Sequence, residues 1–343
     1  MKHCKYILLI LIMLGFYLTV NAQDKKYTIL FYNVENLFDT INSPGVRDEE
    51  FTPTGAKKWD SKKYWQKLSK LEEVFYGVAS AVKDYPTIIG VSEIENRNVL
   101  EDIAALEKLQ KANYQIAHFD SPDARGVDVA LFYRPDQFKY EGSMPITVDV
   151  GFKTRDILMV WGTIENEKFC FFVCHFPSRI GGKQSSEIRR VAAAEYMRKA
   201  ADSMMLVYPG IKIAIMGDMN DDPVDKSLYE VIGAKGNEKE IATNGLFNPF
   251  YEMFKKGFGS LAYNDEWNLF DNIIVNEALL HGEKGTIKLI KAKGAKYYGN
   301  IFNRPFLMQQ SGQYKDYPLR TFIGNVFQNG YSDHLPVFIN IAK

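Results

Sequence analysis

Cysteine is scarce in this chain of 343 residues, which contains only three. Cys4 lies in an apolar N-terminal segment, while Cys170 and Cys174 lie four residues apart in a stretch typical of a strand. Four strand residues span about 13 Å, which is too far for a disulfide between these two side chains. The sequence therefore excludes a disulfide-stapled fold and predicts one that depends on a large apolar core.

Long apolar runs are also absent after the first twenty residues. The N-terminus carries Lys2 and Lys5, then an apolar stretch from Ile7 to Val20, and a small-residue cleavage site at Val20-Asn-Ala22. This order is typical of a secretory signal peptide over residues 1–22, and the stretch is short for a transmembrane helix. We expect an exported protein, either periplasmic or secreted; an uncleaved anchor is the alternative.

Excess charge of either sign is missing as well, because 42 basic residues balance 42 acidic ones. Cleavage of the signal peptide removes two lysines, so the mature chain is slightly acidic. This balance excludes a basic surface over the whole protein, and any phosphate-binding surface must be local. The chain also has no Ser/Gly/Pro-rich linker and no internal repeat. We expect residues 23–343 to form one domain, monomeric and without an obligate protein partner.

What the sequence does contain is a repeated pattern in which an apolar strand ends in acids and amides. In the stretch 211–223, the apolar run stops at Gly217 and is followed by Asp218 and Asn220. Residues two apart share a face of an extended backbone. A carboxylate beside an amide can deprotonate and orient one water molecule. Taken alone, the stretch fits a simple turn equally well.

Three further apolar strands end in the same way. Their polar residues are Asn33 and Glu35, Glu93 and Glu95, and His175. Carboxylate and amide oxygens suit a hard cation such as Mg²⁺. The alternatives are an Asx-type turn, a helix cap at Glu95-Asn96 and a purely structural histidine. Later in the chain, Asp271 lies among apolar neighbours and requires a buried partner.

Two segments could provide local positive charge. In residues 62–75 a helical pattern sets Tyr64, Leu68, Leu71 and Phe75 opposite Lys62, Lys63, Lys67 and Lys70. Such a lysine stripe can hold a phosphate backbone, although it is more often the solvated face of an amphipathic helix. Five further lysines lie between Lys284 and Lys296, in a segment that reads as one or two strands and a long surface loop.

Taken in order, these motifs resemble those of the endonuclease/exonuclease/phosphatase superfamily of metal-dependent phosphodiesterases and phosphomonoesterases. The matching elements are Asn33-x-Glu35, a strand ending in Glu93, His175, Gly217-Asp-x-Asn220, Asp271 and Ser332-Asp-His334. They cover nearly the whole mature chain. The resemblance implies an α/β fold with four layers (α/β/β/α), in which two packed, mainly antiparallel sheets are flanked by helices and the site lies at one end.

The resemblance also implies a role for each residue. Glu93 is expected to be the principal Mg²⁺ ligand, with Mn²⁺ as a possible substitute, and Asn33, Glu35 and Asp333 are expected near the metal. Asp218 and Asn220 are expected to activate and hold the attacking water. His334, fixed by Asp271, is expected to contact the scissile phosphate. His175 could aid the leaving group, with Asp128 as a candidate orienting acid, and the phosphate-binding candidates are Arg179, Arg190 and Arg320.

The resemblance implies a metal-dependent phosphoric ester hydrolase, and we expect an exported nuclease-type phosphodiesterase acting on nucleic acid. A soluble phosphatase would require a closed basic pocket, for which Arg320 and the 284–296 lysines are candidates. A sphingomyelinase-like enzyme would require an exposed apolar docking loop, for which residues 247–251 and Phe254 are candidates, although they suit a buried turn and helix equally well. A binding protein without turnover should have lost at least one of the reactive residues, and all of them are present.

Overall fold

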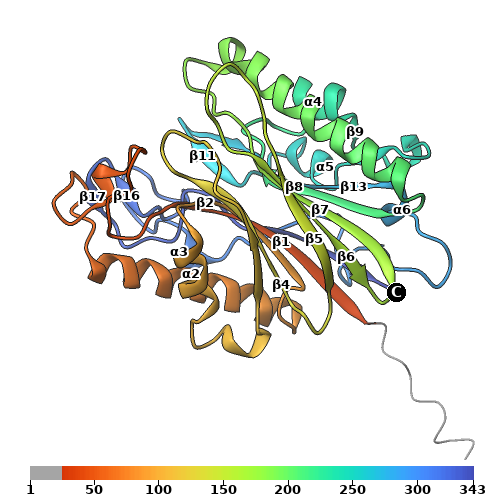
Figure 1. Ribbon diagram of the computed structural model, residues 1–343, viewed down its shortest axis with the longest axis horizontal. Helices are drawn as coiled ribbons and strands as arrows, with labels where there is room; N and C mark the ends of the chain where they lie inside the picture. Colours follow the sequence, from red (N-terminus) through yellow and green to blue (C-terminus); the bar gives the residue numbers. More distant parts are fainter. Residues whose placement is uncertain (1–24) are drawn as a thin grey trace, which may run out of the picture.

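The computed structural model describes residues 25–343, so the expected signal peptide lies outside the described part of the chain. Two seven-stranded sheets pack face to face, with helices on both outer sides (Figure 1). The fold is therefore the four-layer α/β/β/α arrangement expected from the resemblance. No helix within residues 25–343 is long and apolar enough to cross a membrane.

The first sheet brings the two ends of the described chain together. Its order is β14-β18-β1-β2-β4-β3, and β15 also pairs with β18. Within it, β1 and β2 run parallel and the other pairs are antiparallel. The strands are β1 (Lys26–Leu37), β2 (Ile88–Ile94), β3 (Gln115–His118), β4 (Asp128–Tyr133), β14 (Lys288–Ile290), β15 (Asn300–Ile301) and β18 (Val337–Ala342).

The second sheet has the order β5-β6-β7-β8-β13-β10-β9. The pairs β7/β8 and β9/β10 are parallel and the others are antiparallel, so both sheets are mainly antiparallel as expected. The strands are β5 (Lys139–Ile146), β6 (Ile157–Ile164), β7 (Glu167–His175), β8 (Lys212–Asp218), β9 (Ala234–Lys235), β10 (Leu246–Phe247) and β13 (Asp271–Asn276). Two separate ribbons are β11 (Leu261–Tyr263) with β12 (Glu266–Asn268), and β16 (Phe322–Ile323) with β17 (Val326–Phe327).

Two long helices and several short ones complete the layers. Helix α2 (Ser61–Val82) and α3 (Arg97–Ala104) cover the first sheet, and α4 (Lys183–Val207) covers the second; α5 (Tyr251–Phe254) and α6 (Glu277–Leu280) are single turns. Three helices begin where a side chain caps the first turn: Asp60 accepts from the Lys63 N–H, Asn96 from the Val99 N–H and Asn276 from the Leu279 N–H. Asn96 is thus the helix cap that the sequence allowed.

Three apolar clusters separate the four layers. The cluster between the sheets includes Ile29 and Phe31 from β1 and Phe171 and Met216 from the second sheet. The outer clusters join the first sheet to α2 and the second sheet to α4. Cys170 and Cys174 are free thiols in the third cluster, which confirms that they form no disulfide with each other.

Three segments considered as binding surfaces are not placed for that role. Lys67 is buried, because α2 presents this side to residues near the C-terminus, so the lysine stripe is broken. Lys288 lies opposite Ala342, at the far end of β18 from Asp333, so the 284–296 lysines are centred away from the site. Of the two interpretations of residues 247–251, the structure shows the buried turn, because Phe247 and Phe250 pack in the core between the sheets.

Candidate active site

The expected site residues lie at one end of the sandwich. The parallel strands β1 and β2 both end there, and so do the parallel strands β7 and β8. Because β13 runs antiparallel to β8, Asp271 at its start lies directly across from Asp218. The segment before β18 brings Asp333 and His334 to the same place. Parallel and antiparallel pairing therefore gathers side chains that are up to 300 residues apart, as with Asn33 and Ser332.

Backbone irregularities aim three of these side chains. The β1/β2 pairing shifts register between Asn33 and Leu37, and the β2/β4 pairing shifts between Ser92 and Ile94. Glu35 and Glu93 lie inside these bulges at φ values of 52° and 63°, and Asn220 has a φ of 49°. Left-handed backbone is costly for such residues, and bulges near active sites commonly re-aim side chains. The two-residue spacing in the sequence gave no sign of these bulges.

Asp218 lies at the centre of the site and is fully buried. Its Oδ2 accepts a 3.0 Å hydrogen bond from the Asn33 side-chain amide, and its Oδ1 accepts a 2.9 Å bond from the Asn220 N–H. Burial raises the pKa of Asp218 to about 6, with His334 acting in the opposite direction. A carboxylate held in this way can accept a proton near neutral pH.

His334 and Asp271 form the expected pair. His334 Nδ1 lies 2.7 Å from Asp271 Oδ2, which also accepts a 2.5 Å hydrogen bond from the Ser260 hydroxyl. Burial by itself would lower the pKa of His334, but Asp271 and Asp218 outweigh it and raise the pKa well above its usual range. His334 is therefore held as an imidazolium, with Nε2 3.7 Å from Asp218 Oδ2.

His175 has the opposite electrostatic environment. Burial lowers its pKa well below the usual range, and Arg155 and Arg125 act in the same direction. Its Nε2 lies 3.8 Å from Glu93 Oε1 and 3.6 Å from Asp218 Oδ2, and its buried Nδ1 has no hydrogen-bond partner within residues 25–343. The site therefore pairs a neutral histidine with a charged one.

Asp128 does not orient His175, so that expectation is wrong. Asp128 instead contacts His118, with 3.0 Å between Oδ2 and Nε2, and accepts hydrogen bonds from the backbone and hydroxyl of Ser121. The cause is register: β3 pairs with β4 and brings His118 next to Asp128. The sequence had no means of predicting which histidine would be the neighbour.

The donor set at the end of β1 and β2 suits a hard divalent cation. Asn33, Glu35, Glu93 and Asp333 all offer side-chain oxygen atoms; Asn33 Oδ1 accepts from the Glu35 N–H, and Arg320 contacts both Glu35 and Asp333. Burial raises the pKa of Glu35 to about 7, and the charge of Asp333 adds to this. Glu93 Oε2 accepts a 2.9 Å bond from the Asn36 N–H, while its Oε1 has no hydrogen-bond partner within residues 25–343. Glu93 is therefore the carboxylate most available to a metal ion.

The three candidate phosphate-binding arginines have different surroundings. Arg190 is fully buried, with its Nε 2.7 Å from Asp221 Oδ1, so its assignment to phosphate is wrong. Arg179 donates to the Asn220 carbonyl at 2.9 Å and pairs with Asp221, Asp222 and Asp225, which makes it a support for Asn220. Arg320 remains half exposed beside Glu35 and Asp333 and is the one of the three that faces the acidic cluster.

Three residues support the site in roles that the sequence did not indicate. Lys67 donates to the Thr321 hydroxyl at 2.6 Å and to the Tyr331 carbonyl, and Ser260 holds Asp271. Arg155 donates to the carbonyls of His175 and Phe176, at 3.2 and 2.7 Å, and so fixes the end of β7. Lys67 lies in α2, Ser260 lies just before β11 and Arg155 lies just before β6. None of them belongs to a recognisable motif, so only the tertiary contacts reveal their roles.

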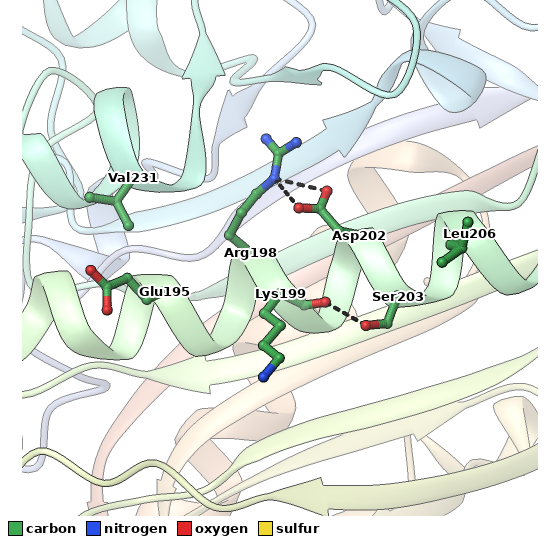
Figure 2. Close-up of a pocket in the computed structure, with 7 residues that line it drawn as sticks. All are labelled: Glu195, Arg198, Lys199, Asp202, Ser203, Leu206 and Val231. Carbon is green, nitrogen blue, oxygen red and sulfur yellow. Dashed lines mark hydrogen bonds and ion pairs between the residues drawn. The ribbon is translucent and has the colours of Figure 1, made fainter.

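A surface hollow on the outer side of α4 offers no comparable chemistry. Figure 2 shows its lining, where Arg198 pairs with Asp202 and the Ser203 hydroxyl donates to the Lys199 carbonyl. Arg198 also donates to the Ile232 carbonyl. These polar groups are bonded to one another along the helix and do not converge on a ligand position.

Comparison with known sequences supplies the family. The Endonuclease/Exonuclease/phosphatase family pattern matches residues 28–343, which is nearly all of the described chain. The chain belongs to this family. The resemblance noted in the sequence is thereby confirmed, as is the expected class of enzyme, a metal-dependent phosphoric ester hydrolase. A comparison with curated protein sequences gives no match.

Several solved structures have the same fold at low sequence identity. D. rerio TDP2 in complex with single-strand DNA product is 14% identical with a TM-score of 0.55, covering 93% of this chain and 100% of that one. The human Nocturnin catalytic domain with bound sulfate is 14% identical with a TM-score of 0.52, at coverages of 94% and 98%. A Bacteroides thetaiotaomicron mannosyl-6-phosphatase is 14% identical with a TM-score of 0.53, at coverages of 92% and 99%. These likenesses establish the fold of the family member described here.

Proposed function

We propose that this protein is an exported, Mg²⁺-dependent phosphodiesterase that hydrolyses phosphodiester bonds of nucleic acid, with Mn²⁺ as a substitute. One observation carries the proposal: Asp218 lies between the Asn33 amide and two histidines, with the carboxylate Glu93 across from it. Attack of water on a phosphodiester needs a proton acceptor, positive charge at the phosphate and a cation position close together. This group of residues provides all three.

Each residue of the candidate site has its own role in the proposed reaction. Asp218 accepts the proton of the attacking water, and Asn33 and Asn220 hold that carboxylate in place. The His334 imidazolium donates a hydrogen bond to a phosphate oxygen and offsets its developing charge. Glu93, with Glu35, Asn33 and Asp333 nearby, would hold Mg²⁺, which when bound neutralises phosphate charge. His175 faces Glu93 and Asp218 as a neutral group that can donate a hydrogen bond to the leaving-group oxygen.

The substrate is assigned by weighing the alternatives. The D. rerio TDP2 relative is named with a single-strand DNA product, which supports nucleic acid. The candidate lipid-docking loop is buried, which counts against a sphingomyelinase-like substrate. With Lys67 buried, the α2 lysine stripe is interrupted, which favours short or flexible strands over long duplex DNA. A phosphatase of a small phosphate ester is the second candidate, because a mannosyl-6-phosphatase shares the fold.

Export and assembly complete the proposal. The N-terminal segment 1–22 has the order of a secretory signal peptide, so we place the mature enzyme in the periplasm or outside the cell. We further propose that it acts as a monomer, because the candidate site is formed by elements of one chain.

The test is a substrate panel with purified mature protein and Mg²⁺. The panel contains single-strand DNA, supercoiled plasmid, RNA, a phospholipid, bis(p-nitrophenyl) phosphate and a sugar phosphate. Asp218→Asn is the matched control, because it preserves shape and removes the proton acceptor. We expect cleavage of DNA or RNA at low salt, loss of activity as salt rises, and none in Asp218→Asn. Turnover of lipid or small monoesters alone, with nucleic acids intact, would overturn the substrate assignment, and no turnover at all would leave the binding-protein alternative.

A further inference from the structure

A small cavity lies against the acidic cluster and has no part in the roles given above. It has a volume of about 190 Å³, and its lining includes Glu35, Asn36, Lys57, Arg320, Thr321 and Phe322. One wall comes from the loop before α2 and the other from the β16/β17 ribbon, and Figure 1 shows these segments together at one end of the molecule. Glu35 belongs both to the lining of this cavity and to the acidic cluster at the proposed cation position. A ligand in the cavity would therefore adjoin the phosphate that is hydrolysed.

Lys57 provides a positioned positive charge in this cavity. Its ammonium donates a 2.7 Å hydrogen bond to the Gly324 carbonyl and lies 5.0 Å from the centre of the Phe322 ring. Its other contact is Glu50, at 3.5 Å, and the side chain is only 15% exposed. An ammonium has three N–H donors, so at least one remains for a ligand. The rest of the side chain is restrained, which lowers the entropy lost on binding.

Arg320 and Asn36 provide further unused donors. Arg320 bonds to Glu35 through Nε and to Asp333 through Nη2, while its Nη1 has no hydrogen-bond partner within residues 25–343. The side-chain amide of Asn36 likewise has none in that range, although its backbone N–H is bonded to Glu93. An ammonium, a guanidinium and an amide around one cavity form a donor set suited to a phosphate group.

The size of the cavity limits what it can hold. A volume of about 190 Å³ corresponds to about six water molecules at their share of the liquid. That space fits a phosphate with part of an attached sugar. Inside the cavity, Glu35 is already bonded by Arg320 and by the Thr321 N–H, so its charge is offset.

We propose that this cavity binds a second phosphate of the substrate, next to the phosphate that is hydrolysed. The inference rests on the proposed function in placing the hydrolysed phosphate at Glu93 and Asp218, and it narrows the substrate to esters with two neighbouring phosphates. Such a pair occurs in a nucleic acid strand and in small bisphosphorylated metabolites. Lys57 would then determine which substrates bind well, without taking part in bond cleavage.

Direct binding by calorimetry tests this proposal without requiring turnover. The full mature chain, with Ca²⁺ in place of Mg²⁺, is titrated with thymidine 3′,5′-bisphosphate and with each thymidine monophosphate. One hydrogen bond to a charged group is worth about tenfold or more in affinity. We expect the bisphosphate to bind at least about tenfold more tightly than either monophosphate. In Lys57→Gln most of this gain should disappear, and in Lys57→Arg it should return.

Lys58→Gln is the matched control, because Lys58 is the adjacent lysine and its ammonium donates to the Thr54 carbonyl outside the cavity. Its bisphosphate preference and its hydrolysis of bis(p-nitrophenyl) phosphate should both equal those of the parent. Equal binding of bisphosphate and monophosphates, or a preference that persists in Lys57→Gln, would refute the cavity assignment. Comparing 5′-phosphorylated dithymidylate with fructose 1,6-bisphosphate then identifies the source of the second phosphate. If the preference for the bisphosphate depends on Lys57 but the protein cleaves no nucleic acid, the proposed nucleic acid substrate is refuted and the assignment of the cavity to a second phosphate stands.

Discussion

The Asp271–His334 pair gives the sharpest test of the candidate site. Asp271 is completely buried, its Oδ2 lies 2.7 Å from His334 Nδ1, and the same oxygen accepts a hydrogen bond from Ser260. The pair holds His334 in its charged form against the effect of burial. Asp271→Asn keeps the shape but removes the negative charge, so the imidazole should lose its proton and its orientation.

The expected cost follows from the role assigned to His334. Removing a positioned charged or proton-transfer group lowers turnover by about 10² to 10⁴, which is about 3 to 5 kcal/mol in activation free energy. His334→Ala should therefore lose activity in that range, and Asp271→Asn should lose nearly as much. Because Asp271 acts through His334, the double variant should be within a few fold of His334→Ala. Ser260→Ala removes only one neutral donor and should cost about tenfold or less.

The assay is hydrolysis of the best substrate in the panel, at saturating and limiting concentrations, with the thermal unfolding midpoint of each variant recorded alongside. Asp128→Asn is the matched control: Asp128 is also buried and also contacts a histidine, His118, at 3.0 Å. Its effect should multiply with that of His334→Ala. If Asp271→Asn and His334→Ala also multiply, the two residues act independently and the pair has no functional meaning.

Three further predictions concern the cation position, a buried lysine and the thiols. A chelator should abolish hydrolysis, and full activity in its presence would contradict the metal requirement. Glu93→Gln should weaken Mg²⁺ binding, measured by calorimetry, at least tenfold and leave the thermal unfolding midpoint unchanged. Lys67→Met should lower the free energy of unfolding, measured in urea, by about 2 to 3 kcal/mol, because it leaves buried acceptors without a donor. Lys62→Met, at an exposed position, should change the free energy of unfolding by no more than about 0.5 kcal/mol. Cys170 and Cys174 should resist iodoacetamide until the protein unfolds, because burial raises both thiol pKa values, and reductant should not shift the unfolding midpoint.

The sequence determined the strand ends, and with them most of the candidate site. Each apolar run stops at a polar residue that cannot be buried alone, so Asn33, Glu93 and Asp218 could be selected before any fold was known. Order along the chain then linked these positions to a family, and the family supplied the four layers. Cysteine spacing in a strand was enough to exclude a disulfide, because the distance follows from backbone geometry alone.

Only the tertiary structure decided which partner each charged residue meets. Asp128 and Asp271 look alike in the sequence, yet strand pairing gives one to His118 and the other to His334. Lys67 has the same helical spacing as Lys62, which is exposed, but it faces the C-terminal segment and is buried. Arg190 was assigned to phosphate and instead lies in the interior beside Asp221. Such contacts join residues tens to hundreds of positions apart, and a local pattern holds no information about them; they are fixed by register and packing.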